Sequence, residues 1–385
     1  MHLPDFVVLS HLRWGFVLQR PQHLMTRFAR SRRVFFVEEP IFHDGPPRMK
    51  VTEPAPNVFV AVPLLPHHHS HAENIAEQRR LLDELLGERR VHQPIAWFYT
   101  PMAMPFARHL AASAVIWDCM DELSHFAFAP KELVDLEREL LAHADLVFTG
   151  GHSLYEAKRD RHHSVHAFPS SVDAEHFAAA RGHRRDPVDQ ASLGHPRLGF
   201  YGVVDERFDT ELVAAVADAR PDWNLVVVGP VAKIDPRSLP RRANIRWIGQ
   251  RGYAELPAYL SGWDVAIMPF ALNDATKYIS PTKTLEFLAG GKPVVSTPIR
   301  DVVRPYGEHA VVRIAGTPDE FVAACAAALS EDAGERIARA DAVLSQTSWD
   351  RTHARMAALI DEVCERRRGR HDHPNHPREA ACSTI

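Results

Sequence analysis

Short apolar runs and longer amphipathic stretches alternate along most of the chain. In the first half, Phe6–Ser10 and Leu146–Thr149 have the composition of buried strands, and Lys131–His143 has the apolar spacing of a helix. Such alternation favours an α/β fold with a parallel sheet covered by helices on both faces. The other elements expected in this half are strands at Val34–Val37, Val58–Val62, Ile95–Tyr99 and Val115–Asp118, a helix at Glu73–Leu86 and a helix that opens near Gln19.

A second alternating pattern begins near Arg197 and predicts a second domain of the same class. We expect domains at residues 1–180 and 197–345, a polar linker at 181–196, a closing helix at 346–367 and a disordered tail at 368–385. The strands expected in the second domain start at Arg197 and continue at Trp223–Gly229, Asn244–Gly249, Asp264–Pro269, Pro293–Thr297 and Val311–Ile314. The helices expected there are Thr210–Ala219, Tyr253–Leu260 and Pro318–Leu329.

One stretch, Ser280–Thr297, combines a helix start, a short helical body, a glycine stop and a buried strand. Its first residue, Ser280, suits a helix N-cap, and Pro281 suits the first helical position, where its missing N–H costs nothing. Gly290 and Gly291 then end the helix. Free N–H groups at a helix start carry partial positive charge, so this element is suited to hold phosphate.

Two charged residues stand in the first turns of this expected helix. Lys283 would add a full positive charge beside a phosphate, and Glu286 could accept hydrogen bonds from a pair of sugar hydroxyls. We interpret the element as a holder for the diphosphate and ribose of a nucleotide sugar. The residues alone leave an alternative open, in which Lys283 and Glu286 simply pair on the surface of an ordinary amphipathic helix.

Further candidates lie where expected strands end, because that edge of an open α/β sheet is its usual ligand edge. Gly15 follows the first strand, and Gly202 ends the first strand of the second half. Arg207 lies in the next loop, where it suits a diphosphate, with an exposed loop arginine as the alternative. Asp118 and Asp121 follow an apolar strand to this edge, where a general base is useful, but a turn or N-cap aspartate is the alternative.

Three polar clusters are less specific. The loop at residues 11–23 contains Arg20 and Gln22, and either a chemical role or a capped helix start accounts for it. The histidines at residues 67–71 follow prolines and lack helical ligand spacing, which argues against a metal site. The arginines at residues 27–33 lie near a helix end, where they offset the helix dipole; contact with an anionic membrane surface is the alternative.

The composition of the 385 residues narrows the class of protein. Hydrophobic residues make up 45% and charged residues 24%, as in a soluble globular protein, and the length suits two domains. A formal net charge of −4 gives no sign of nucleic-acid binding. The four cysteines lack Cys-x-x-Cys spacing, so neither zinc nor a disulfide framework is indicated. No signal peptide or membrane span is recognisable, so we expect a reducing, cytoplasmic setting.

The stretch Tyr278–Thr297, Tyr-Ile-Ser-Pro-Thr-Lys-Thr-Leu-Glu-Phe-Leu-Ala-Gly-Gly-Lys-Pro-Val-Val-Ser-Thr, resembles the donor-nucleotide motif of group 1 glycosyltransferases with the GT-B fold, family four or close to it. Ala144–Thr149, Asn244–Gly249 and Leu256–Phe270 support the resemblance. Trp14–Leu24 is similar to relatives among bacterial cell-surface polysaccharide enzymes. The resemblance implies two Rossmann-like domains facing across a cleft, with the donor nucleotide on the second and the acceptor on the first.

The same resemblance suggests roles for individual residues. Glu286 is the expected ribose-binding carboxylate, Arg207 the counterpart of a phosphate-binding arginine, and Asp121 the candidate acid or base. The family has a second glutamate, eight residues before Glu286, that approaches the donor sugar; here that position is Tyr278, which leaves the sugar and the stereochemical outcome open. The expected catalytic residues are Asp121, Arg207 and Lys283; the donor-nucleotide residues are Gly202, Ser280, Pro281, Thr282, Lys283 and Glu286; the acceptor or cleft residues are Gly15, Arg20, Gln22 and Tyr278.

The expected activity is transfer of a hexosyl or deoxyhexosyl group from a nucleotide-diphosphate sugar to a glycan or lipid-linked acceptor. Fixed dipoles and cations can stabilise charge on the departing phosphate, and an Asp-x-Asp motif is absent, so we expect neither a metal nor another cofactor. Two rivals stay open: an epimerase or phosphorylase on the same architecture, and a catalytically degenerate partner. A dinucleotide-dependent oxidoreductase is disfavoured because the chain lacks a Gly-x-Gly-x-x-Gly motif.

Overall fold

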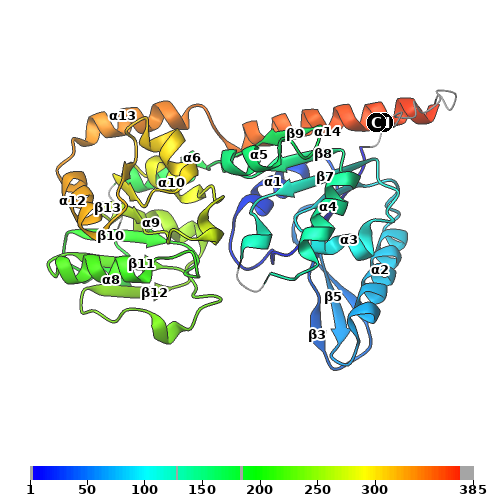
Figure 1. Ribbon diagram of the computed structural model, residues 1–385, viewed down its shortest axis with the longest axis horizontal. Coiled ribbons are helices and arrows are strands. Elements are labelled where there is room, and N and C mark those ends of the chain that lie inside the picture. Colours follow the sequence, from blue (N-terminus) through cyan, green and yellow to red (C-terminus); the bar gives the residue numbers. More distant parts are fainter. Residues whose placement is uncertain (1–2, 127–128, 183–184, 373–385) are drawn as a thin grey trace, which may run out of the picture.

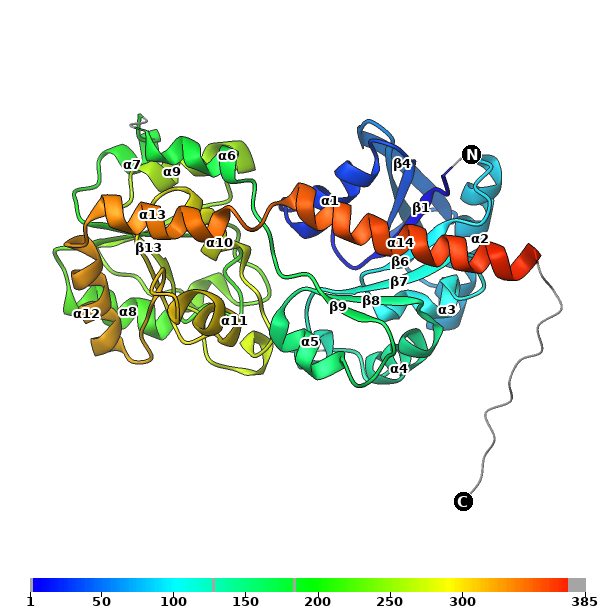
Figure 2. The same cartoon turned by 90° about the horizontal axis from the view of Figure 1, so that it is seen from above.

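The computed structural model describes residues 3–126, 129–182 and 185–372. These residues form two domains that lie side by side, each built on a sheet with helices packed against both faces (Figures 1 and 2). The α/β class expected from the alternating pattern is confirmed, because strands and helices follow one another in both domains and neighbouring strands run parallel with few exceptions.

Within the described ranges the first sheet has nine strands, in the order β3-β5-β2-β1-β6-β7-β8-β9, with β4 antiparallel to β5. Two apolar cores, one on each face, bury the alternate side chains of the central strands. The strands are β1 Phe6–Ser10, β2 Val34–Glu38, β3 Ile41–His43, β4 Arg48–Ala55, β5 Val58–Pro66, β6 Ile95–Phe98, β7 Ala114–Cys119, β8 Leu146–Thr149 and β9 Val165–Ala167. The helices are α1 Arg20–Phe28, α2 His71–Glu88, η1 Pro101–Ala103, α3 Met104–Ala107, η2 Leu123–His125, α4 Leu133–His143 and α5 His152–Lys158.

In the same ranges the second sheet has six parallel strands in the order β12-β11-β10-β13-β14-β15. The strands are β10 Arg197–Tyr201, β11 Asn224–Val228, β12 Ile245–Gly249, β13 Val265–Met268, β14 Val294–Ser296 and β15 Arg313–Ile314. The helices are α6 Ala174–Ala178, η3 Ala179–Arg181, α7 Val188–Ala191, α8 Thr210–Ala219, η4 Pro236–Ser238, η5 Tyr253–Glu255, α9 Leu256–Ser261, η6 Asp274–Thr276, α10 Thr282–Ala289, α11 Arg300–Val302, η7 Val303–Gly307, α12 Pro318–Leu329, α13 Ala333–Leu344 and α14 Trp349–Asp372.

The chain crosses from the first domain to the second earlier than residue 180, where we expected the first domain to end. Phe168 is buried in a core of the first domain, whereas Val172 and Phe177 are buried in the core of the second. The crossing therefore lies between residues 168 and 172. The α6 helix belongs to the second domain because Phe177 fills its core.

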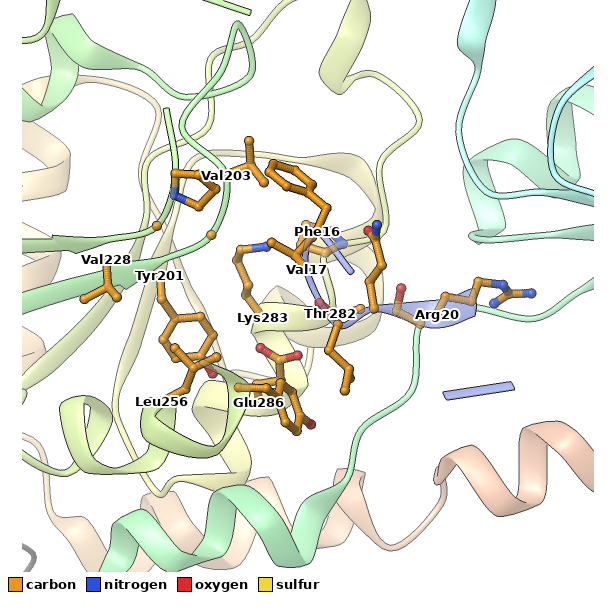
Figure 3. Close-up of a pocket in the computed structure, with 18 of the residues that line it drawn as sticks. Phe16, Val17, Arg20, Tyr201, Val203, Val228, Leu256, Thr282, Lys283 and Glu286 are labelled. Carbon is orange, nitrogen blue, oxygen red and sulfur yellow. The ribbon is translucent and has the colours of Figure 1, made fainter. Parts of the chain in front are cut away.

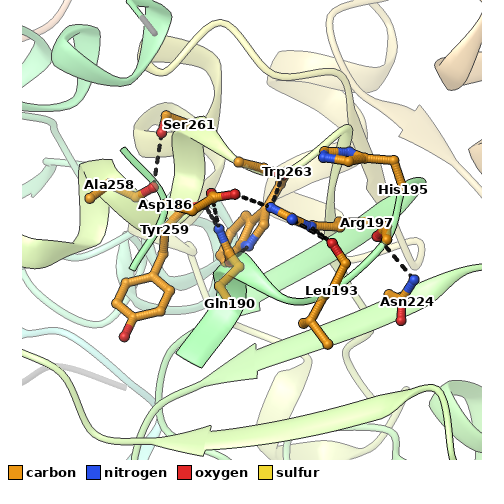
Figure 4. A network of polar contacts seen from close by, with 12 residues as sticks. Asp186, Gln190, Leu193, His195, Arg197, Asn224, Ala258, Tyr259, Ser261 and Trp263 are labelled. Atoms are coloured by element: carbon orange, nitrogen blue, oxygen red, sulfur yellow. Dashed lines mark hydrogen bonds and ion pairs between the residues drawn. The ribbon is translucent and has the colours of Figure 1, made fainter. Parts of the chain in front are cut away.

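The segment expected as a free linker is bound to the second domain by a network of polar contacts (Figure 4). The side chain of Gln190 accepts a hydrogen bond from Trp263 Nε1 at 2.8 Å and donates one to Asp186 at 3.0 Å. Asp186 also pairs with the buried guanidinium of Arg197 at 2.7 Å. Most of this segment therefore packs as part of the domain, although its composition is that of a loop.

The α14 helix returns along the first domain, as Figure 2 shows. Its side chains Met356 and Ile360 are fully buried in a core that also contains Phe28 of α1. The helix extends to Asp372, five residues beyond the expected end at residue 367. The rest of the expected disordered tail lies outside the described residues. Within the described part of the chain, every helix is too short or too polar to cross a bilayer.

Candidate active site

A cleft of about 420 Å³ opens between the two domains and collects most of the residues that the sequence singled out (Figure 3). The first domain contributes the loop from Gly15 to Arg20, together with Asp121. The second domain contributes the ends of β10 and β11 and the start of α10. Of the twelve expected site residues, the ten that line the cleft are Gly15, Arg20, Asp121, Gly202, Arg207, Ser280, Pro281, Thr282, Lys283 and Glu286.

The α10 helix starts one residue later than expected. Pro281 is the N-cap, with extended backbone, and Thr282 is the first helical residue. Ser280 is not the N-cap; its carbonyl accepts a hydrogen bond from Ser170 Oγ, at 2.7 Å, and so ties the start of α10 to the interdomain crossing. Gly290 ends the helix as expected, because the next residue, Gly291, has the left-handed φ of +71° that glycine accepts without strain.

Lys283 lies against the end of β10 and points into the cleft (Figure 3). Its stem passes Gly202, whose φ is +147°, and a Cβ built at Gly202 would lie 2.1 Å from Lys283 Cε. Only glycine therefore leaves room for this lysine. Burial lowers the pKa of the Lys283 ammonium, which forms no hydrogen bond or ion pair with any residue that the structure describes.

Glu286 follows one turn after Lys283 and faces the same cleft (Figure 3). Burial raises the pKa of its carboxyl, and the nearby Lys283 ammonium opposes that shift. The two side chains do not form an ion pair on an exposed helix face, so the surface-pair alternative is wrong. Together they present one cation and one carboxylate to whatever occupies the cleft.

Arg207 is held on one side by the carboxylate of Asp205. Its Nη2 lies 2.6 Å and its Nε 3.0 Å from the two oxygens of that buried aspartate. Arg207 lines the cleft, and among described residues its Nη1 has no hydrogen-bond partner. The arrangement fits a guanidinium that is oriented by one carboxylate and keeps donors for an anion.

The two candidate aspartates of the first domain have different surroundings. Asp118 is fully buried in β7 and accepts two hydrogen bonds from Arg20, at 2.8 and 3.0 Å. It is neither an N-cap nor a base at the surface. Asp121 lines the cleft, where burial raises the pKa of its carboxyl and Arg207 opposes the shift. Asp121 is therefore the candidate acid or base that the geometry retains.

Three of the expected acceptor or cleft residues play other parts. Arg20 lines the cleft, but its guanidinium points away from Lys283 in Figure 3 and binds Asp118 and the carbonyl of Phe168, because a buried cation needs such partners. Gln22 does not line the cleft; its amide donates to the carbonyls of Trp14 and Val17, at 2.8 and 2.9 Å, and so braces the loop that does.

Tyr278 is likewise absent from the cleft lining. Its ring centroid lies 5.4 Å from that of His125 in the first domain, and it packs against an apolar core there. A half-buried aromatic ring gains more from this interdomain contact than from facing a polar cleft. The expected place of Tyr278 in the cleft is therefore wrong.

The polar clusters of the first domain are explained by local contacts. Arg27 and Arg30 both pair with Asp350 of α14, at 3.0 and 3.1 Å, and Arg32 pairs with Asp361 at 2.7 Å. Arg27 also lies in the last turn of α1, as the helix-dipole interpretation expects, so these ion pairs and the helix end together account for the arginine run. Across the described residues, no group of three or more histidine, cysteine, aspartate or glutamate side chains is placed to hold a metal ion.

Two residues outside the expected site set, Tyr201 and Gly229, also line the cleft; the sequence had indicated the loop that begins at Gly229 as a second loop at the same edge. Tyr201 ends β10 and lines the cleft, and its buried hydroxyl lies beside the carboxylate of Glu286. Gly229 ends β11 with a φ of +148°, and a Cβ there would lie 1.8 Å from the carbonyl of Gly202. Gly229, like Gly202, directly follows an apolar strand, and this position is the sequence signal that indicates it. Tyr201 reads only as a strand residue.

Comparison with known proteins shows which families this chain resembles. Residues 195–331, which contain β10 to β15 and α10, match the model of a family described as glycosyl transferases group 1. TuaH of Bacillus subtilis (strain 168), provisionally named a teichuronic acid biosynthesis glycosyltransferase, is 27% identical over 276 residues, which are 66% of this chain and 68% of that protein. The second domain of the chain therefore resembles the group 1 glycosyltransferases.

Solved structures with low sequence identity share the fold of this chain. A trehalose-6-phosphate protein from E. coli, bound with UDP-2-fluoro glucose, aligns with a TM-score of 0.67 at 13% identity, over 94% of this chain and 99% of that one. Sucrose-phosphate synthase from Thermosynechococcus elongatus aligns with a TM-score of 0.69 at 14% identity, over the same shares. The two-domain GT-B fold expected from the motif is confirmed.

Proposed function

We propose that this protein is a group 1 glycosyltransferase that transfers a sugar from a nucleotide-diphosphate sugar to a glycan or lipid-linked acceptor of a cell-surface polysaccharide. One observation carries the proposal: Lys283 and Glu286, at the start of α10, open into the interdomain cleft beside Arg207. A diphosphate suits the two cations and the helix start, and a ribose diol suits the carboxylate. The name of TuaH supports the polysaccharide setting.

In the proposed reaction, the bond between the sugar C1 and the β-phosphate oxygen breaks, and the acceptor hydroxyl forms the new bond at C1. Negative charge grows on the departing phosphate, where Lys283 and Arg207 stabilise it. Asp121 lines the first-domain side of the cleft, and in this proposal it takes the acceptor proton. Closure of the two domains over the donor would exclude water.

The first experiment is a thermal-shift screen of the purified chain with UDP, GDP, ADP, CMP and dTDP and their sugars. A ligand that binds only the native state raises Tm, by an amount that grows with its concentration. We expect one base to stand out and its diphosphate to exceed its monophosphate. If none of the nucleotides raises Tm, the chain does not bind a donor and the proposal is wrong.

We also propose that transfer needs no metal, since protein cations and the helix start supply the charge at the phosphate. With the donor found in the screen, turnover in EDTA is expected to equal turnover in magnesium or manganese. Loss of activity in EDTA that either metal restores would contradict metal independence. The same assay separates the rivals: an epimerase alters the donor without an acceptor, and a degenerate partner does not alter it at all.

A further inference from the structure

Phe126 of the first domain contacts two cations of the second. Its ring centroid lies 5.5 Å from Cζ of Arg207 and 5.1 Å from Nζ of Lys233. The face of an aromatic ring is electron-rich, so a cation within about 6 Å of its centroid is attracted to it. Phe126 does not line the cleft, whereas Arg207 does. The ring therefore touches Arg207 from outside the ligand space.

Arg207 is constrained on two sides and open on a third. Asp205 receives hydrogen bonds from Nε and Nη2, and Phe126 lies within reach of the guanidinium carbon. No hydrogen bond from Nη1 to a described residue is found. Asp205 belongs to the same loop as Arg207, so Phe126 is the part of this support that comes from the other domain.

Lys233 reaches the same ring from a separate loop, after β11. Its φ of +61° lies in the left-handed region, which non-glycine residues seldom adopt. Its ammonium forms neither a hydrogen bond nor an ion pair within the described ranges of the chain. The aromatic face of Phe126 is thus a direct contact of this lysine across the domain boundary.

The segment that presents Phe126 is anchored to its own domain. Glu122, at the start of this segment, pairs with the buried ammonium of Lys158 at 2.7 Å, and Lys158 also pairs with Glu137 at 2.7 Å. The neighbouring His125 lies against Tyr278 of the second domain. The first domain therefore fixes the ring of Phe126 at the interdomain contact.

We propose that Phe126 is a positioning residue that, from the opposite domain, holds Arg207 toward the donor diphosphate; Lys233 contacts the same ring but does not line the cleft. This inference rests on the proposed function. The ring supplies a fixed, uncharged partner, so it orients the two cations without neutralising them, as a carboxylate would. It also makes their placement depend on the domains lying together. When the domains separate, both cations lose this contact.

The test measures binding of inorganic pyrophosphate by isothermal titration calorimetry, because pyrophosphate carries the diphosphate charge without a base or sugar. Phe126→Leu keeps an apolar side chain but removes the aromatic face, so we expect Kd to rise about three- to tenfold. Phe126→Trp keeps an aromatic face and should stay within about twofold of the wild type. Rescue by tryptophan is a readout that a purely structural role would not give.

Phe59→Leu is the matched control. The ring of Phe59 also contacts a guanidinium, since Cζ of Arg89 lies 5.3 Å from its centroid. Phe59 belongs to β5, however, and does not line the cleft. This variant should bind pyrophosphate as the wild type does. Unfolding midpoints in urea check that all three variants are folded. Wild-type affinity in Phe126→Leu, or equal loss in the leucine and tryptophan variants, overturns the inference while leaving the proposed function intact.

If wild-type protein binds neither pyrophosphate nor any nucleoside diphosphate, the anion site itself is refuted, and the proposed function and this inference fail together. If a nucleoside diphosphate binds the wild type and Phe126→Leu equally well, only the inference fails. The two failures are therefore distinguishable in one set of titrations.

Discussion

At the scale of single residues, the candidate site holds charges that the protein alone leaves poorly compensated. Burial raises the pKa of Glu286 and lowers the pKa of Lys283, so both are shifted toward their neutral forms. Neither shift is cancelled by an ion pair between them. A ligand that brings hydroxyl donors and a phosphate anion would stabilise both charged forms. Such uncompensated charge is typical of sites that trade stability for binding.

Replacing Glu286 by Gln should therefore stabilise the ligand-free protein and weaken nucleotide binding. The folded-state pKa of Glu286 is above its unfolded value, so the ionised carboxyl costs stability at all pH values above that raised pKa. At pH 7 we expect Glu286→Gln to raise Tm by about 2 °C. The gain should shrink as pH falls toward the unfolded value of this carboxyl, near 4.5. Differential scanning calorimetry from pH 4 to pH 8 measures it.

The same substitution should weaken nucleotide binding, although it stabilises the ligand-free protein. The diphosphate identified in the thermal-shift screen should bind Glu286→Gln about tenfold more weakly, because an amide oxygen is a poorer acceptor than a carboxylate for a ribose diol. A lower Tm together with unchanged nucleotide affinity would mean that Glu286 supports the fold and does not contact the ribose.

A second residue-scale prediction concerns Gly202. Alanine there requires a strained φ and a Cβ that overlaps the stem of Lys283, so Gly202→Ala should lower the free energy of unfolding by about 1–3 kcal/mol and displace the lysine. Gly249→Ala is the matched control. Gly249 also ends a strand and has a φ of +81°, but its Cβ would meet nothing within 4 Å.

Urea unfolding and pyrophosphate titration of both glycine variants separate strain from steric overlap. Both should lose stability, and only Gly202→Ala should lose anion binding as well. Equal affinity in the two variants would show that the position of Lys283 does not matter for the anion.

At the scale of elements, the apolar pattern predicted the strands that occupy the centre of each sheet. These strands are buried on both faces, so their sequences are continuous apolar runs, as in β1, β8 and β13. The pattern missed β3, β4 and β9. β4 lies at the margin of the sheet with most of its residues exposed, so its sequence carries no run that distinguishes it from a loop.

Helix starts were harder to predict than helix bodies, because a cap depends on contacts outside the helix. Ser280 has the right side chain for an N-cap, yet its backbone is held by Ser170 and the helix begins after Pro281. The end of α10 was predictable because it depends only on the conformation of glycine. The candidate site lies at the start of α10, which the sequence predicts less well than the end of this helix.

The α14 helix gives a prediction at this scale. Its residues follow the second domain in sequence but complete a core of the first, where Ile360 has no exposed surface. Ile360→Ala should lower the free energy of unfolding by about 3 kcal/mol, since it removes buried methyl groups and leaves a cavity. Glu365→Ala, on the exposed side of the same helix, should change it by less than 0.5 kcal/mol in magnitude, by the rough scale for surface substitutions.

Chemical denaturation followed by circular dichroism measures the two helix variants. A cost near 1 kcal/mol or less for Ile360→Ala would mean that α14 does not seal this core in solution.

At the scale of the whole molecule, the cleft brings together groups that no sequence neighbourhood contains. Asp121 comes from the first domain, and Arg207 and Lys283 come from two elements of the second. The motif located the part of the cleft formed by the second domain, because α10 carries its charged residues within one turn. The part formed by the first domain was predicted less well. Arg20 and Gln22 were chosen by residue type, and the sequence does not show that Asp118 and the backbone of the Gly15 loop already bind them.

A substitution of Asp121 tests whether groups from both domains act together in the cleft. Burial raises the pKa of its carboxyl toward the range where a general base is effective, and the Arg207 cation across the cleft limits that rise. Asp121→Asn removes the base and keeps the shape. With the donor from the screen, kcat should fall about 10²- to 10⁴-fold, while the affinity for the nucleoside diphosphate stays within about twofold. A matched control, Asp274→Asn in η6 outside the cleft lining, should change neither quantity.

On this proposal, Asp121→Asn does not lower nucleotide affinity while leaving kcat unchanged. That result would mean that Asp121 contributes to donor binding and does not activate the acceptor, and the roles assigned to the two domains would have to be exchanged.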